Sequence, residues 1–277
     1  MEIKINTIKL KLLACLSVLL IVAACTKQST DSTLISEPVV QSYLIPGQVV
    51  TVKLYQQKQL TDTATYGPPI TGIQVHISDG SKNVLLTETA SGVYTYNDPT
   101  FLVVGKTYTL QFNYLTFSVS AQTVMPGVPA NFAVTDTAIY IANATTTPNS
   151  AIDTLDRFTW SNPDSLNHVI VFKNLTGPDL PISRSFFRSN NTNINFEANT
   201  NRTSVFLITQ NTLPYYARYQ VILYRVNTEY INMIASNTNT ATSQTLTNTY
   251  TNIVNGYGIF TAMQPAVQVI YITVYST

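Results

Sequence analysis

Few side chains in this sequence of 277 residues could carry out acid–base or nucleophilic chemistry, and its histidines are His76 and His168. A hydrolytic triad needs a base beside its nucleophile, usually a histidine. Neither histidine is accompanied by a Gly-x-Ser-x-Gly or a His-Glu-x-x-His motif. We therefore expect both to be ordinary surface residues. His76 should point to solvent, because its neighbours Val75 and Ile77 should face a core.

Carboxylates are also sparse. Asp153 and Asp156 lie three positions apart, and Asp62 and Asp98 fall in predicted loops. Oxygen-rich loops can bind calcium, but the alternating acids and glycine of an EF-hand are missing. A glycosidase pair could meet in space without a signature in the sequence, and no Gly-x-x-x-x-Gly-Lys phosphate loop is present. We interpret the protein as a non-enzyme without a cofactor or metal, while a calcium site and a carboxylate pair stay open.

Cysteine chemistry is confined to one position. Cys25 ends an apolar run that begins at Leu12 and follows the small residues Ala23 and Ala24, after a basic N-terminal stretch. This arrangement describes a secretory signal, and the run is shorter than the roughly 20 residues that span a bilayer. The ending resembles a bacterial lipobox, whose cysteine is lipidated; an ordinary secretory signal is the alternative. We predict a signal peptide that is removed (1–24), lipidation of Cys25 and a polar tether (25–33).

Composition excludes several classes of protein. Removing residues 1–24 takes away three lysines and one glutamate, so the formal net charge changes from +1 to −1. A nearly neutral chain offers no basic field to a phosphate backbone, so we expect no nucleic-acid partner. Charged residues make up 10% of the sequence and hydrophobic ones 45%, a balance that favours a buried core over disorder. The other cysteine, Cys15, lies in the removed segment, so we expect no disulfide or zinc site.

The pattern predicts an all-β protein built of two tandem β-sandwiches of the immunoglobulin or fibronectin type III kind. Its Thr, Tyr and Val residues suit a pleated, half-buried surface, and its Asn residues suit turns. Short strands separated by turn residues predict an N-terminal sandwich over residues 34–127, whose clearest hairpin turns at Asp79-Gly80. Breakers at Pro126–Pro129 close this unit. Residues 128–277 should form the second sandwich, and we expect Trp160 in its core.

One short helix and a doubly buried strand are expected in the second sandwich. Asn227 can cap a helix. Apolar residues recur after it at helical spacing, namely Val226, Tyr230, Met233 and Ile234. Toward the C-terminus, Gln264–Tyr275 alternates apolar residues with neighbours that are also mostly apolar. That pattern is typical of a central strand buried on both faces.

Binding by exposed tyrosines is the functional route that the residues favour. Loops on the rim of a sandwich carry recognition, and exposed tyrosines can stack on sugar rings or anchor a protein interface. The alternative is that most of them cover sheet faces. The candidate ligand-contact residues are Tyr55, Tyr66, Tyr94 and Tyr96 in the first unit, and Tyr215, Tyr216 and Tyr219 in the second.

Four features of the sequence carry a resemblance. They are the lipobox at Cys25, Pro69–Gly80 followed by Thr87–Tyr94, Gly105–Leu110 leading to Met125-Pro126, and Asn252–Phe260. In this order they resemble a Bacteroidetes lipoprotein family catalogued as domain of unknown function 4249, over essentially the whole mature chain. Asn255 stands where that family has a glycine, and asparagine is the next most tolerant residue of positive φ. Gly256 and Gly258 should supply backbone freedom.

The resemblance implies an outer-membrane lipoprotein, often encoded beside TonB-dependent transporters, with no known reaction and no assigned ligand-binding residues. We expect a lipid-anchored, non-catalytic accessory that captures a carbohydrate or peptide ligand for such a transporter, or docks onto it. A structural or adhesive surface protein is the alternative, and a carbohydrate-active enzyme with an unrecognised carboxylate pair is a third. Asp31 is the only acid soon after Cys25, so the face of the outer membrane, periplasmic or external, stays open.

Overall fold

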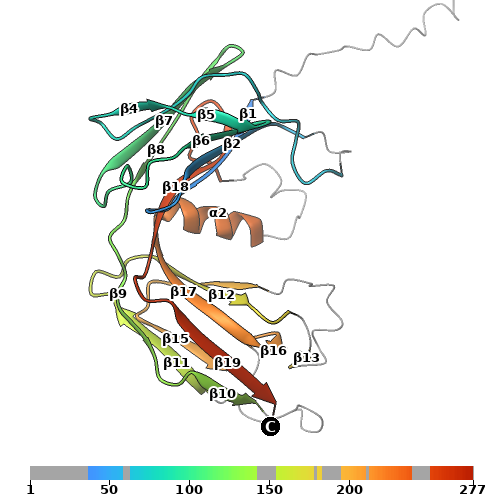
Figure 1. Cartoon of the computed structure of the whole chain (residues 1–277), viewed down its shortest axis with the longest axis vertical. Helices are drawn as coiled ribbons and strands as arrows, with labels where there is room; N and C mark the ends of the chain where they lie inside the picture. The colour runs from blue at the N-terminus through green and yellow to red at the C-terminus, as the bar shows by residue number, and fades with distance from the viewer. Residues whose placement is uncertain are drawn as a thin grey trace, which may run out of the picture. The chain divides into compact units, whose positions relative to one another are not determined.

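The computed structural model describes residues 37–58, 63–141, 154–177, 180–182, 195–209, 212–238 and 250–276 (Figure 1). The predicted signal peptide, Cys25 and the tether lie outside these residues, as do Asp62 and Asp153. The regular structure of the described residues is β-strand apart from one α-helix. The predicted all-β fold with a short helix is therefore confirmed. No helix among these residues has the length and apolarity needed to cross a membrane.

Two sheets enclose the first hydrophobic core. One contains β1 (Pro38–Leu44), β2 (Val50–Gln56), β6 (Val93–Tyr96), β5 (Thr87–Ala90) and, from the far end of the chain, β18 (Tyr257–Pro265). The other has the order β4 (Asn83–Leu85), β3 (Val75–Ser78), β7 (Thr107–Tyr114) and β8 (Phe117–Val124). Every second side chain of β1, β2 and β7 is buried, as expected of strands with one face on a core.

The predicted hairpin is present at the predicted turn. Strands β3 and β4 pair antiparallel with Ile77 opposite Val84. The Asp79 carboxylate accepts hydrogen bonds from the backbone N–H groups of Ser81 and Lys82, at 2.9 and 2.7 Å. Gly80 adopts a φ of +86°. A side-chain cap and a left-handed glycine thus form the turn that the Asp-Gly pair indicates.

A second core lies between two further groups of strands. The first is the sheet β15 (Val205–Thr209), β11 (Thr154–Ser161) and β9 (Ala130–Val134). The second contains β10 (Ala138–Ile141), β19 (Ile270–Ser276), β17 (Arg218–Val226), β12 (His168–Asn174) and β14 (Phe196–Asn199), and the short strands β13 (Leu180–Pro181) and β16 (Tyr215–Tyr216) pair with each other. Phe158, Phe172 and Tyr219 are fully buried here, and Trp160 belongs to the same core as predicted.

Strand β18 connects the two cores. Its pairing differs from the predicted division of the chain at residue 127. It pairs in parallel with β1, with Gly258 opposite Val40, and its last residues pair antiparallel with β17 (Figure 1). Ile253, Phe260 and Ala262 belong to the first core, although the sequence analysis places everything after residue 127 in the second sandwich. The segment before β19 therefore completes the N-terminal core, because β18 lies between β1 and β17 and supplies the strand that β1 pairs with.

The predicted helix is present as α2 (Thr228–Thr238). The backbone N–H of Tyr230 donates to the carbonyl of Asn227 at 3.2 Å, so the helix begins where the cap was predicted. Tyr230 and Ile234 of its apolar stripe pack on a cluster formed by Val169, Val226 and Met263. The helix thus covers the junction of β12, β17 and β18.

A buried hydroxyl joins α2 to both neighbouring strands. Thr123 of β8 donates to the Glu229 carboxylate at 2.7 Å. The same oxygen accepts hydrogen bonds from the Asn227 amide at 2.9 Å and from the Ala262 backbone N–H at 3.0 Å. Since an unmade bond to a buried polar group is costly, Thr123 fixes the start of the helix against β8 and β18.

The predicted doubly buried C-terminal strand is wrong. Strand β19 begins only at Ile270, and Val267 before it is 88% exposed. Ile270, Ile272 and Val274 are buried, whereas Tyr271 and Tyr275 on the other face are exposed. The strand does lie between β10 and β17, but a core covers one of its faces only.

We expect Gly258→Ala to destabilise the fold by about 4 kcal/mol or more, a size that marks a severe steric defect. Gly258 has a φ of +99°, and a Cβ there would stand 2.0 Å from the carbonyl oxygen of Val40. The matched control is Gly47→Ala, at a φ of +77° with no atom within 4 Å, which should lose only about 1–2 kcal/mol of backbone strain. Urea unfolding of the lipid-free mature chain measures both, and equal losses would contradict the close approach of β18 to β1.

Thr123→Val should lower the free energy of unfolding by about 1–3 kcal/mol, because the Ala262 N–H and the Asn227 amide lose a buried partner. Thr107→Val, at an exposed position of the adjacent strand β7, is the matched control and should change stability little. Thermal unfolding measures the difference. If both variants melted at the same temperature, Thr123 would have no role in holding the helix.

Candidate functional site

Three of the predicted ligand-contact tyrosines, Tyr94, Tyr216 and Tyr219, belong to the cores. The Tyr94 hydroxyl donates to the carbonyl of Ile70 at 3.0 Å, and its ring is buried in the first core. The Tyr216 hydroxyl donates to the carbonyl of Ile141 at 3.3 Å in the second core. Tyr219 is also fully buried. These rings offer no face to a ligand, so the prediction does not hold for them.

Tyr55 and Tyr66 are brought together at the surface. Their rings stack with centroids 4.8 Å apart and an angle of 9° between planes. Tyr55 is half-buried and Tyr66 is 48% exposed. Partial burial raises the pKa of the Tyr55 hydroxyl, and the neighbouring Tyr66 adds to this effect. Each ring therefore already covers one face of the other, which leaves one face of Tyr66 to solvent.

Tyr96 belongs to a polar cluster that includes Asp98. Its hydroxyl accepts a hydrogen bond from Lys82 at 2.6 Å and donates to Asp98 at 3.2 Å. The hydroxyl and backbone N–H of Thr100 lower the pKa of Asp98 to about 2. The Asp98 carboxylate is thus engaged by Thr100, Tyr96 and Lys82. Tyr215, the remaining candidate, is half-buried, and its carbonyl accepts a hydrogen bond from the Tyr219 hydroxyl at 2.8 Å.

His168 is not the surface residue that the sequence predicts. Its side chain is 2% exposed, its Nδ1 lies 3.1 Å from the carbonyl oxygen of Leu166, and its ring lies 5.9 Å from that of Trp160. Burial lowers the pKa of His168, and the positive charge of Arg225 lowers it further. The histidine is therefore a neutral core residue, since burial disfavours its charged form.

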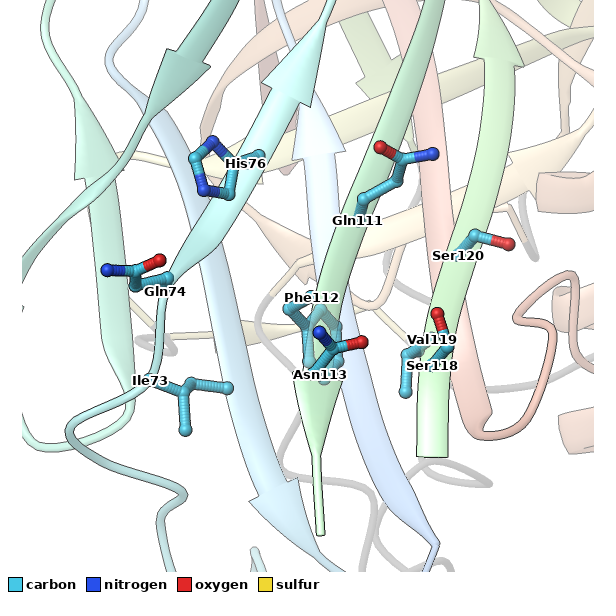
Figure 2. Close-up of a pocket in the computed structure, with 9 residues that line it drawn as sticks. All are labelled: Ile73, Gln74, His76, Gln111, Phe112, Asn113, Ser118, Val119 and Ser120. Carbon is cyan, nitrogen blue, oxygen red and sulfur yellow. The ribbon is translucent and has the colours of Figure 1, made fainter. Parts of the chain in front are cut away.

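His76 lies where it was predicted, on the outer face of the second sheet. It is half-buried, whereas its neighbours Val75 and Ile77 are fully buried. The register places His76 beside Gln111, and Gln111 beside Ser120. A polar hollow of about 610 Å³ lies over this face, and Figure 2 shows its polar side chains, which are Gln74, His76, Gln111, Asn113, Ser118 and Ser120.

The polar hollow is lined mainly by hydrogen-bonding groups. Its amides and hydroxyls can donate and accept hydrogen bonds with a neutral polar ligand. Among the described residues that line it, none is a carboxylate, lysine, arginine or cysteine. Of its described lining residues, His76 is the one titratable group.

A surface rich in tyrosine lies on the outer face of β10, β19 and β17. Tyr140 stacks on Tyr275 with centroids 5.2 Å apart, and the two residues are direct partners in the parallel pairing of β10 with β19. Tyr271 lies on the same face of β19 as Thr273 and Tyr275. The centroid of its ring is 5.2 Å from the Cζ atom of the Arg218 guanidinium. We call Tyr140, Tyr271, Tyr275 and Arg218 the outer tyrosine face.

The sequence analysis missed the outer tyrosine face because it assigned β19 to the interior. Tyr140, Tyr271 and Tyr275 are 61%, 43% and 45% exposed. Alternation was available as a signal, since Ile139 and Ile141 flank Tyr140, Ile270 and Ile272 flank Tyr271, and Val274 precedes Tyr275. Tyrosine fits both buried and exposed positions of a strand. The alternation of residues along β19 therefore did not show which face of the strand is exposed to solvent.

Asp156 is one of the acids for which a calcium site or a carboxylate pair stayed open, and neighbouring backbone groups hold it. Asp156 is buried, and its Oδ1 accepts hydrogen bonds from the N–H groups of Arg157 at 2.7 Å and Asp136 at 3.3 Å. Burial raises the pKa of Asp156, and its Oδ2 has no hydrogen-bond partner. In the described part of the chain, no three His, Cys, Asp or Glu residues gather as a metal site would require. Asp153 lies outside that part.

Comparison with known proteins identifies a family. The family model described as Domain of unknown function (DUF4249) matches residues 29–268, which confirms the resemblance seen in the sequence. No curated protein matches the chain. Two solved structures are similar over most of it: a Salmonella alpha-2-macroglobulin variant (11% identity, TM-score 0.23, 87% of this chain) and the native conformation of E. coli alpha-2-macroglobulin (10%, 0.20, 83%). The chain covers 15% and 14% of those proteins, and likeness at these scores carries no argument.

The burial of His168 predicts a pH dependence of stability. The folded pKa is lowered, so the stabilisation is fully present above the unfolded pKa of about 6.5 and is lost as the pH falls from there toward the folded value. Urea unfolding at pH 7.5 and 5.5 should show wild type losing more stability on acidification than His168→Gln. Thr107→Val, which changes no titratable group and lies at an exposed position of β7, is the control and should keep the wild-type pH dependence. The same pH dependence in wild type and His168→Gln would show that the histidine does not titrate as its burial implies.

Proposed function

We propose that this chain, which belongs to the family described as Domain of unknown function (DUF4249), is a non-catalytic accessory protein of the outer membrane. Lipid on Cys25 holds it there, and it docks onto a membrane partner protein or captures a ligand for one. A TonB-dependent transporter is the partner that the family resemblance implies. Each buried methylene of an acyl chain contributes roughly 0.8 kcal/mol, so two or more chains would anchor the protein stably.

The outer tyrosine face is the observation that carries this proposal. Tyrosine and arginine are enriched in the energetically important centres of protein interfaces. Tyr140, Tyr271 and Tyr275 lie on adjacent strands with between two-fifths and two-thirds of each side chain exposed, and Arg218 lies over the Tyr271 ring. Clustered apolar surface of this kind marks an interaction site more often than isolated exposed residues do.

The polar hollow supports the ligand-capture form of the same function. Its amide and hydroxyl groups, from Gln74, Gln111, Asn113, Ser118 and Ser120, suit the hydroxyl groups of a neutral carbohydrate. It lies on the sheet of β3, β7 and β8, whereas the outer tyrosine face lies on β10, β19 and β17. One surface could thus bind a ligand while the other contacts a partner. A structural or adhesive protein is the alternative function.

A pull-down from native membranes tests the proposal. We expect tagged full-length protein, extracted in mild detergent, to bring down an outer-membrane transporter at near-equal amounts. Replacing Tyr140, Tyr271 and Tyr275 together by serine should reduce this recovery at least tenfold, because the central aromatic contacts of interfaces carry most of their energy. Mass spectrometry and densitometry of the eluate measure the outcome.

Two controls separate docking from anchoring. Tyr66→Ser removes a tyrosine of comparable exposure from the first sandwich and should leave recovery unchanged. Cys25→Ala removes the lipid site, so the protein should leave the membrane fraction. Recovery of the wild-type protein alone would argue against the accessory function and favour adhesion, and an equal effect of Tyr66→Ser would show that the outer tyrosine face is not the contact.

A further inference from the structure

A second hollow, of about 550 Å³, lies where the chain passes from the first sandwich to the second. Its walls are the linker Met125–Gly127, the loop Ser165–Asn167 before β12, and the segment Arg225–Thr228 that ends β17 and starts α2. Arg202, in the turn between β14 and β15, completes it. This volume falls within the range of about 300–1,000 Å³ in which proteins bind small organic molecules.

The two arginines give the hollow an uncompensated positive charge. Of the described residues that line it, none is acidic. The ion pairs of the described chain join Lys82 to Asp98 and Lys106 to Asp79, so neither arginine is paired with a described carboxylate. Glu229, in the first turn of α2, directs its carboxylate to the hydroxyls of Thr123 and Thr261 instead.

Both guanidinium groups are positioned by neighbouring groups. The Nε of Arg202 donates to the side-chain oxygen of Asn167 at 3.0 Å, and the Asn167 amide donates in turn to the Thr228 hydroxyl at 3.3 Å. The Nη1 atom of Arg225 lies 2.9 Å from the position that a Cβ would take at Gly127, so the absence of a side chain there makes room for it. Bonding of Arg202 through Nε leaves its two Nη groups for other acceptors.

The positive charge of Arg225 also acts on its neighbour His168. The two residues are direct partners in the pairing of β12 with β17. The pKa of the His168 imidazole is lowered by burial first and by the charge of Arg225 in addition.

We propose that Arg202 and Arg225 bind the phosphate group of a small phosphate monoester. A single guanidinium suffices for a carboxylate, whereas two guanidinium groups that no described carboxylate pairs with match the charge of about −2 and the three terminal oxygens of a phosphate monoester. The Asn167 and Thr228 side chains supply further polar contacts, and the apolar side chains of Val104, Val124 and Leu166 line the room left for the organic group. This site is separate from the outer tyrosine face and does not depend on its function.

Calorimetric titration with phenyl phosphate, inorganic phosphate and benzoate tests the proposal on the lipid-free mature chain. We expect phenyl phosphate to bind with a submillimolar Kd that weakens as salt is added, and to bind more tightly than the other two probes. Arg202→Gln and Arg225→Gln should each raise this Kd at least tenfold. Arg157→Gln, which removes the same charge at an exposed position of β11 outside the hollow, should leave it unchanged.

A further variant separates loss of the site from loss of the fold. Gly127→Ala keeps both arginines but places a Cβ against the Nη1 of Arg225, so it should weaken binding without removing a charge. No heat with phenyl phosphate at 10 mM, or an equal loss in Arg157→Gln, would overturn the proposal. Equal affinity for inorganic phosphate would overturn its claim that the hollow accepts the organic group, and equal affinity for benzoate would overturn the choice of phosphate.

Discussion

The parallel pairing of β1 with β18 is the constraint on which the rest of the structure depends. Parallel neighbours cannot be joined by a tight turn and need a long connection, and here that connection contains most of the second sandwich. The pairing brings Phe260 and Ala262 into the first core, while the last residues of β18 pair with β17 of the second. Gly258 allows the close pairing of β18 with β1, because any side chain at its position would meet the Val40 carbonyl.

Helix α2 and the hydroxyl of Thr123 fix the position of β18 against its neighbouring strands. The helix buries Tyr230 and Ile234 against Val169, Val226 and Met263, at the junction of the strands that β18 connects. The Thr123 hydroxyl oxygen links the start of the helix to the backbone of β18, because it donates to Glu229 and accepts from Asn227 and Ala262. Apolar packing supplies most of the free energy, and the hydrogen bonds select one arrangement because a shifted one would leave buried polar groups without partners.

Local features of the fold could be predicted from the sequence, and features set by distant residues could not. The Asp79-Gly80 turn, the start of α2 after Asn227 and the positive φ of Asn255, which is +58°, depend on neighbours in the chain. The burial of His168 depends on Trp160 and Arg225, and no pattern near residue 168 reports them. The membership of Phe260 in the first core likewise depends on β1.

The same distinction applies to the candidate site. The tyrosines of the chain divide between core and surface: Tyr94 and Tyr216 are buried, while Tyr140, Tyr271 and Tyr275 are exposed. Residue type does not tell these apart, because tyrosine can fill a core with its ring and satisfy its hydroxyl on a carbonyl, as Tyr94 does with Ile70. Three separate loops and the end of β17 bring Arg202 and Arg225 into one hollow. Their spacing in the sequence therefore did not indicate that they lie together.

The late position of β18 in the chain has a consequence for how the protein is made. About 210 residues separate the paired segments of β1 and β18. Closing so long a loop carries an entropic cost, contacts of this sequence separation slow folding, and synthesis delivers the N-terminal part first. Until residue 257 emerges, β1 has an open edge, and open edges invite pairing with other chains. The N-terminal sandwich of this protein is therefore among the first parts to be synthesised and among the last to be finished.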